Sequence, residues 1–225
     1  MTTITHHLPD RLLMAYSAGA LPEAFSLVVA THISMCDECR ARLGAYDALG
    51  GAVLAACETA EMSDDALAAT LARIDAQDRA STDAADATAI APTRRMARRR
   101  LLPAPLQDYV GGDLDAVRWS RAGPGVHQAI LRTGRDATAR LLRIRGGAAM
   151  PEHGHRGLEL TLVLQGAFRD AEDRFGPGDI EIAGSDLHHT PVAEAGPDCI
   201  CLAATDAPLR FSSLLPRIAQ RFLRI

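Results

Sequence analysis

The chain has 225 residues, of which 48% are hydrophobic, and its formal net charge is −4. This length accommodates one large domain or two small ones, and the composition is that of a globular protein. The net negative charge argues against general nucleic-acid binding, because nucleic-acid-binding surfaces are usually basic. No apolar run approaches the ~20 residues that span a bilayer, and the N-terminus lacks the pattern of a signal peptide. We therefore expect a cytoplasmic protein without a membrane partner.

Apolar residues at helical spacing predict three helices in the first 60 residues. The first covers 8–19, the second enters through Pro22 and runs to about Ser34, and the third runs from about Asp37 to Cys57. Three short helices bury little apolar surface, so a bound metal would supply part of the folding energy.

A cluster of metal-ligand residue types lies between the second and third predicted helices. His32, Cys36 and Cys39 stand at positions i, i+4 and i+7. They would share one face of a continuous helix, or lie together where one helix ends and an acidic first turn starts the next. Two thiolates and one imidazole leave one tetrahedral position open, and His7 would close a structural zinc site.

Other interpretations of these residues are a redox dithiol and incidental cysteines without a ligand role. A Cys-x-x-Cys pair can be a redox dithiol, but that motif usually follows a strand, whereas the segment before Cys36 is predicted to be helical. His6 adjoins His7 and competes with it for the ligand position. Cys57 has no partner at ligand spacing, and we expect a small buried hydrophobic residue there.

Residues 63–79 predict a fourth helix with a narrow apolar stripe formed by Leu67, Leu71 and Ile74. The following residues, 80–105, have no hydrophobic periodicity and are expected to form a linker. The stripe would therefore dock either on the first three helices or on a partner protein. The arginine-rich run at 94–100 is interpreted as a solvated tether and not as a DNA-binding element.

After about residue 106 the pattern changes to short apolar segments separated by glycine-rich and proline-rich turns, which is typical of a β-sandwich or small barrel. His127, isolated on one of these segments, is expected to be an ordinary packed histidine. The predicted strands are 126–131, 138–144, 158–165, 179–182, 199–204 and 209–213.

A second ligand cluster lies among these strands. Residues 147–166 follow the pattern Gly-x5-His-x-His-x3-Glu-x6-Gly, with the ligand types at His153, His155 and Glu159. On extended chain the two histidines project to the same face, and the glutamate can face them across a turn. This ligand set suits zinc, iron, manganese or nickel. Either His188 or His189 supplies a fourth ligand, because adjacent strand residues point to opposite faces.

Cys199 and Cys201 occupy one face of a predicted strand. Their Cα atoms would be about 6.5 to 7 Å apart, at the edge of what a disulfide tolerates. They are either two buried core residues or oxidisable thiols near the second metal.

The pattern from Gly147 to Gly166 resembles the first motif of the cupin superfamily at every fixed position. The second cupin motif is matched poorly, because Ala183-Gly184-Ser185 replaces the usual Pro-x-Gly.

The whole chain, with its His-x24-His-x3-Cys-x2-Cys pattern before a linker and a cupin-like segment, resembles the zinc-dependent anti-sigma factors of the ChrR type. The resemblance implies an N-terminal domain that binds one zinc and sequesters a group IV (extracytoplasmic-function) sigma factor 1:1. It also implies a cupin domain that binds a second zinc and is needed for release in the presence of singlet oxygen or organic hydroperoxide. The ligands implied are His7, His32, Cys36 and Cys39 for the first zinc (Zn2+), and His153, His155, Glu159 and His189 for the second.

The predicted organisation is therefore a zinc-stapled all-α anti-sigma domain over 1–80, a flexible linker over 81–105 and an all-β cupin (jelly-roll) domain over 106–225. We expect a regulatory protein that is not an enzyme, with residues 1 to about 85 sufficient for partner binding. The alternative is a cupin metalloenzyme of the dioxygenase or isomerase type with an appended interaction domain. A separate four-ligand helical module favours the regulator, because an enzyme for small molecules has no need of one. The candidate partner-binding residues are Leu67, Leu71 and Ile74, and the candidate redox pair is Cys199 and Cys201.

Overall fold

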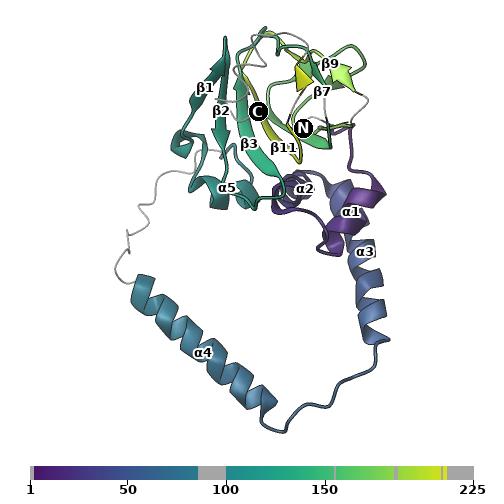
Figure 1. Cartoon of the computed structure of the whole chain (residues 1–225), viewed down its shortest axis with the longest axis vertical. Coiled ribbons are helices and arrows are strands. Elements are labelled where there is room, and N and C mark those ends of the chain that lie inside the picture. Colours follow the sequence, from purple (N-terminus) through teal and green to yellow (C-terminus); the bar gives the residue numbers. More distant parts are fainter. Residues whose placement is uncertain (1–2, 86–99, 155, 185–186, 209, 212–225) are drawn as a thin grey trace. The chain divides into compact units, whose positions relative to one another are not determined.

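The computed structural model describes residues 3–85, 100–154, 156–184, 187–208 and 210–211 (Figure 1). Within these ranges the helices precede the strands, as the sequence predicts. The helices are α1 (Asp10–Ser17), α2 (Glu23–Met35), α3 (Asp37–Ala55), α4 (Ala66–Ala85), α5 (Ala104–Val110) and the 3-10 helix η1 (Leu114–Ala116). The strands are β1 (Ser120–Gly123), β2 (Val126–Ile130), β3 (Thr138–Ile144), β4 (His153–Gly154), β5 (Glu159–Gln165), β6 (Phe168–Arg169), β7 (Arg174–Phe175), β8 (Ile180–Ala183), β9 (His188–His189), β10 (Val192–Ala193), β11 (Cys199–Thr205) and β12 (Arg210–Phe211).

The chain divides into two compact units. One contains residues 1–51 and 100–225, and the other contains residues 52–99. This division differs from the predicted one, because the first helices belong to the same unit as the strands. Helix α4 also extends five residues into the predicted linker, and α5 begins before its end. Residues 86–99, which include most of the arginine-rich run, lie outside the described residues.

The strands form one large antiparallel sheet and two small ones. The large sheet has the order β1-β2-β3-β11-β5-β8, and the small sheets have the orders β10-β6-β7 and β12-β4-β9. The longer strands β2, β3, β5, β8 and β11 lie where the sequence predicts them, whereas the four-residue strand β1 was not predicted. The two-residue strands other than β12 were not predicted, because two residues are too few to show an alternating pattern. Of the predicted strand 209–213, only Arg210 and Phe211 are described, as β12.

Strand β11 is buried on both faces of the large sheet. Ile200, Leu202 and Ala204 belong to the core that includes the apolar residues of α2. Cys199 and Cys201 belong to a second apolar cluster on the opposite face. Such alternation follows from strand geometry, since successive side chains point to opposite faces.

Helix α2 covers the outer face of this sheet. It packs across β3, β5 and β11 and against α5 (Figure 1). Seven of its thirteen residues are buried, so the helix is apolar around most of its circumference. A helix with so little polar surface needs cover on several sides, and here α1 and the sheet both pack against it.

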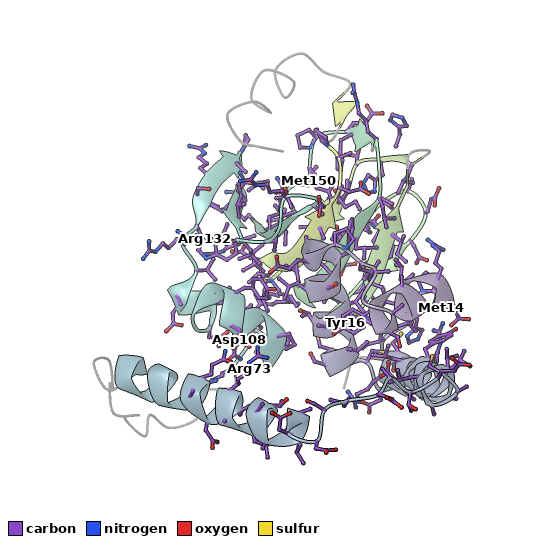
Figure 2. The ribbon with its side chains drawn as sticks, turned by 60° about the horizontal axis from the view of Figure 1, so that its bottom comes forward. Met14, Tyr16, Arg73, Asp108, Arg132 and Met150 are labelled. Atoms are coloured by element: carbon purple, nitrogen blue, oxygen red, sulfur yellow. The ribbon has the colours of Figure 1, made fainter. Side chains whose placement is uncertain are left out.

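Helix α3 exposes most of its apolar side chains, and so does the part of α4 whose side chains are described. On α3 only Cys39 and Leu43 are buried, while Leu49 and Val53 are exposed. On α4, residues 67–77 are all exposed, among them Arg73 (Figure 2). A search of the described residues finds no helix with the length and apolar character needed to cross a membrane.

Candidate metal centres

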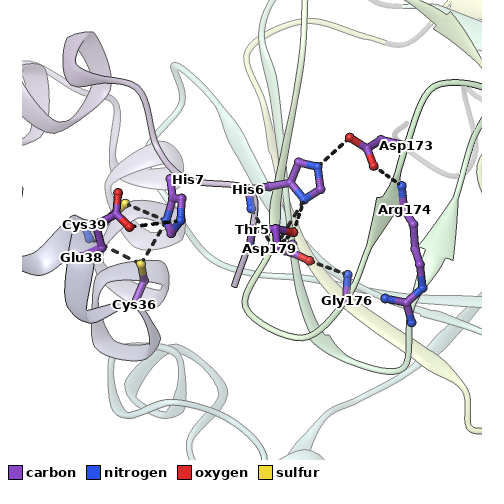
Figure 3. Close-up of polar contacts among 10 residues, drawn as sticks. All are labelled: Thr5, His6, His7, Cys36, Glu38, Cys39, Asp173, Arg174, Gly176 and Asp179. Atoms are coloured by element: carbon purple, nitrogen blue, oxygen red, sulfur yellow. Dashed lines mark hydrogen bonds and ion pairs between the residues drawn. The ribbon is translucent and has the colours of Figure 1, made fainter. Parts of the chain in front are cut away.

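The first ligand cluster is assembled from three segments: the residues before α1, the end of α2 and the start of α3. The ligand atoms of His7, His32, Cys36 and Cys39 all lie within 4.8 Å of one another. His7 Nδ1 is 3.3 Å from Cys36 Sγ and 3.8 Å from Cys39 Sγ (Figure 3). The structure therefore brings together all four residues of the first predicted site.

Cys36 lies at the break between two helices, which selects one of the two predicted geometries. Its backbone is extended, with φ −111° and ψ 107°, and its N–H donates to the carbonyl of His32 and ends α2. Helix α3 then begins at Asp37, with Asp37 and Glu38 in its first turn. The Cys39 N–H donates to Cys36 Sγ at 3.4 Å.

The burial of His32 and Cys39 favours a bound cation in this cluster. His32 is fully buried, and burial lowers its pKa to about 4, against small opposing effects of the Gly178 backbone and Asp179. Neither ring nitrogen of His32 has a well-formed hydrogen bond to any described residue. Burial raises the pKa of Cys39 to about 11. A neutral, buried, unpaired imidazole beside two thiols is costly unless a cation occupies the space between them.

The residues around the cluster orient its ligands. His7 Nε2 lies 3.4 Å from the carboxylate of Glu38, so its Nδ1 is the nitrogen that faces the sulfur atoms. His6, the competing candidate, points away from the cluster (Figure 3). Its Nε2 is 2.9 Å from Asp173 Oδ2, and its ring packs 4.4 Å from that of Phe175.

The second cluster lies where short strands meet inside the barrel. His153 on β4 pairs with His189 on β9, and their ring centroids are 4.7 Å apart. Glu159 begins β5, and its charge acts on the pKa of both histidines. His155, the remaining predicted ligand, lies outside the described residues.

The structure distinguishes the two adjacent histidines. The side chain of His189 is 3% exposed, whereas His188 is exposed and lies over Gly154, where an added Cβ would come within 2.5 Å of the His188 ring. Strand alternation thus turns His189 inward and His188 outward. Burial lowers the pKa of His153, which favours the neutral form that binds metals.

Two carboxylates beside His189 were not predicted. Its Nδ1 lies 3.0 Å from Glu181 Oε1 and 3.4 Å from Asp170 Oδ2, and these three residues form a second group with metal-ligand spacing. Burial lowers the pKa of His189, but the two carboxylates outweigh it and the net shift is upward. Carboxylates on the Nδ1 side of a histidine orient its ring, and such partners are typical of histidines that bind a metal through the other nitrogen. The sequence feature that could have pointed to this group is Glu181, a charged residue within the apolar strand β8, where it pairs with Thr161 of β5.

The remaining cysteines differ in exposure. Cys199 and Cys201 are buried with sulfur atoms 3.6 Å apart, and the hydrogen bond with Cys199, together with burial, raises the pKa of Cys201. Cys57 is exposed, which contradicts the expected buried position, because no described residue of its own unit covers the end of α3. His127 is also exposed and not packed, since it stands on the outer face of β2.

The candidate partner-binding stripe is open to solvent. Leu67, Leu71 and Ile74 are 71%, 52% and 50% exposed. Three large apolar side chains at helical spacing with this exposure form a surface of the kind that partner proteins cover.

Comparisons with known proteins agree with this arrangement. Residues 107–207 match the family model described as the ChrR cupin-like domain. The anti-sigma-E factor ChrR of Cereibacter sphaeroides is 60% identical over 223 residues, which are 99% of this chain and 100% of that protein. The crystal structure of Rhodobacter sphaeroides SigE in complex with the anti-sigma ChrR contains a chain that is 57% identical, with a TM-score of 0.77, covering 91% of this chain and 100% of that one.

These matches confirm the predicted fold class, a helical segment with a His/Cys cluster followed by a β-rich cupin-like domain. The similarity to the relative that is 60% identical extends over its full length, so both predicted halves are included in the match. The chain belongs to the ChrR family of anti-sigma factors.

Proposed function

We propose that this chain sequesters a group IV (extracytoplasmic-function) sigma factor in a 1:1 complex and keeps it from RNA polymerase. The observation that carries the proposal is the full-length similarity to an anti-sigma-E factor, together with a solved structure in which such a chain is bound to SigE. Since sigma factors act on RNA polymerase, the chain would work in the cytoplasm. The net charge of −4 agrees with a protein partner and not with direct nucleic-acid binding.

The first cluster is proposed to hold zinc. Two thiolates and two imidazoles form the tetrahedral S2N2 set typical of structural zinc sites, and no ligand position stays open for chemistry. Bound zinc would supply folding energy at the junction of three segments. The chain's own contribution is to present a neutral His32 and to hold Cys36 at the break between α2 and α3.

The barrel site is proposed to hold a second zinc through His153, His155, Glu159 and His189. Two imidazoles paired across β4 and β9 and a carboxylate at the start of β5 support this assignment. Release of the sigma factor by singlet oxygen or organic hydroperoxide would begin at this site. Cys199 and Cys201 are candidate redox groups. Both are buried, and the hydrogen bond with Cys199, together with burial, raises the pKa of Cys201, which lowers the reactivity of that thiol in this state.

The exposed stripe on α4 is proposed as part of the sigma-binding surface. It carries Leu67, Leu71 and Ile74, none of which packs in the interior of its own unit. The alternative function, a cupin metalloenzyme with an appended interaction domain, has no support from the full-length relative, which is an anti-sigma factor.

The test is copurification of the full chain with the sigma factor from native cells. The proposal predicts a stoichiometric complex, and zinc at two equivalents per chain by elemental analysis. A chain that is recovered without a sigma factor, and that fails to bind one when purified proteins are mixed, would contradict it.

A further inference from the structure

The residues before His7 fasten the first metal cluster to the barrel. Residues 4–6, here called the strap, lie against the start of β8. The buried carboxylate of Asp179 accepts hydrogen bonds from Thr5 N at 2.7 Å, His6 N at 2.9 Å and the Thr5 hydroxyl at 3.3 Å. Ile180 N donates to the His6 carbonyl at 3.4 Å. The backbone immediately before His7 is thus held by the barrel (Figure 3).

The turn between β7 and β8 is shaped to receive the strap. Gly178 has φ +93°, and a Cβ added there would come within 2.5 Å of Ile4 Cδ1. Both the left-handed backbone and the close approach of Ile4 therefore require glycine. The Gly178 backbone also lies close enough to His32 to act on its pKa. The β7–β8 turn therefore lies next to His32, and it is connected to His7 through the strap.

The β6–β7 turn links the strap to the second cluster. At one end, Asp173 Oδ2 lies 2.9 Å from His6 Nε2. At the other end, Asp170 Oδ2 lies 3.4 Å from His189 Nδ1. Between them, Asp170 Oδ1 accepts the N–H groups of Glu172 and Asp173, both at 2.9 Å, which holds the four-residue turn in one conformation.

These contacts form a continuous path from His189 to His7. We propose that the strap and the β6–β7 turn couple the two metal centres, so that a displacement of His189 loosens the strap and, with it, the His7 ligand of the first cluster. The direction of this signal, from barrel to zinc module, rests on the proposed function. Coupling between two sites is reciprocal, so disturbance of the first cluster must also affect the second.

The path predicts which side chains transmit the change. A ligand or oxidant alters a distant site only through contacts that differ between its two states, and His6–Asp173 and Asp170–His189 are the contacts at the two ends of the turn. Asp173 is the better residue to alter. Asp179 also accepts the Gly176 N–H at 2.8 Å, so its loss would disturb its own turn.

The first experiment measures amide hydrogen exchange of residues 4–8 in the full-length, metal-loaded protein. Asp173→Ala and His189→Ala are each expected to speed exchange there several-fold. Glu172→Ala is the matched control. It removes an exposed carboxylate from the same turn, whereas the contact with His6 Nε2 is made by Asp173. Wild-type exchange in Asp173→Ala, or equal acceleration in Glu172→Ala, would overturn the proposal.

The second experiment tests coupling by a double-mutant cycle. Labelling of Cys36 and Cys39 by a maleimide, located by mass spectrometry, reports opening of the first cluster, and exposed Cys57 serves as an internal reference. His189→Ala should increase labelling in the wild-type background but add nothing in the Asp173→Ala background. An equal increase in the labelling of Cys36 and Cys39 in both backgrounds would overturn the proposal. Neither experiment uses the sigma factor, so failure of sigma binding and failure of this coupling are distinguishable.

Discussion

Cys36 combines two roles that the sequence displays separately, a metal ligand and a helix boundary. Its N–H closes α2 on the His32 carbonyl at 2.8 Å, and its carbonyl accepts the Arg40 N–H at 3.1 Å within the next helix. The ligand geometry and the angle between α2 and α3 therefore depend on the same residue. Loss of the metal should disturb both.

Replacement of Cys36 or Cys39 by serine is expected to unfold the N-terminal helical segment. Structural zinc contributes roughly 10 to 16 kcal/mol of apparent binding free energy in small peptides, against the ~5 to 15 kcal/mol by which domains are stable. Circular dichroism of the full chain should show loss of helix. Cys57→Ser is the matched control and should behave as wild type, because Cys57 is exposed. Full helicity in the Cys36→Ser protein would contradict the structural role of the metal.

Glu181→Gln is expected to weaken metal binding in the barrel by about 10- to 100-fold, the usual effect of losing a carboxylate that orients a ligating histidine. The carboxylate lies 3.0 Å from His189 Nδ1 and its position is buried. Competition with a chromophoric chelator measures the affinity. Exposed Glu172→Gln should leave it unchanged, and equal affinity in both variants would remove Glu181 from the metal's surroundings.

At the scale of single residues, the grouping of His32, Cys36 and Cys39 could be predicted from the sequence because these residues are close along the chain, and the structure brings His7 to them. The choice between His188 and His189 required the structure, since alternation along a strand says only that one of the two side chains points inward. Glu181 comes from strand β8 and Asp170 from the β6–β7 turn, and only the fold brings them to His189. Contacts made across the barrel have no signature in local spacing.

At the scale of elements, helix positions and the longer strands follow from hydrophobic periodicity, and their ends differ by a few residues because helix ends fray and short turns intervene. Helix α5 was not predicted because seven residues are too few to show a clear helical period. The apolar stripe of α4 was correctly recognised, and in its own unit the stripe is exposed.

Leu67→Asp or Leu71→Asp is expected to weaken sigma binding by about 10- to 100-fold while the first metal stays bound. Burying one leucine side chain is worth ~1.5 to 3 kcal/mol, and each ~1.4 kcal/mol changes affinity tenfold. Ala69→Asp places the same charge on the opposite face of α4 and is the matched control. Calorimetric titration measures the affinity. Unchanged affinity in both leucine variants would show that the stripe is not the contact surface.

At the scale of the whole molecule, the predicted separation of helical module and barrel misses a shared core. Helix α2 contributes Val28 and Val29 to the same apolar core as Leu162 and Leu202 of the sheet. Sequence periodicity shows that α2 is apolar, but it does not show which element covers it. A fragment of residues 1–85 would retain the first cluster and α4 yet expose the face of α2 that the sheet now buries.

Leu202→Ala is therefore expected to destabilise α2 as well as the sheet. Truncation of a buried leucine typically costs 2 to 5 kcal/mol, as a rough guide, and Leu202 is fully buried. Amide exchange under mild denaturant should show the same loss of protection in α2 and in β11. Unaltered protection in α2 would indicate that the helices and the barrel unfold independently.

The central claim is that the barrel metal governs release of a partner held elsewhere on the chain. His189→Ala removes a buried candidate ligand, whereas His188→Ala alters the adjacent exposed histidine. In cells exposed to singlet oxygen, a reporter driven by the sigma-dependent promoter should stay silent with His189→Ala and respond nearly as wild type with His188→Ala. A reporter that switches on normally in the His189→Ala strain would contradict the claim.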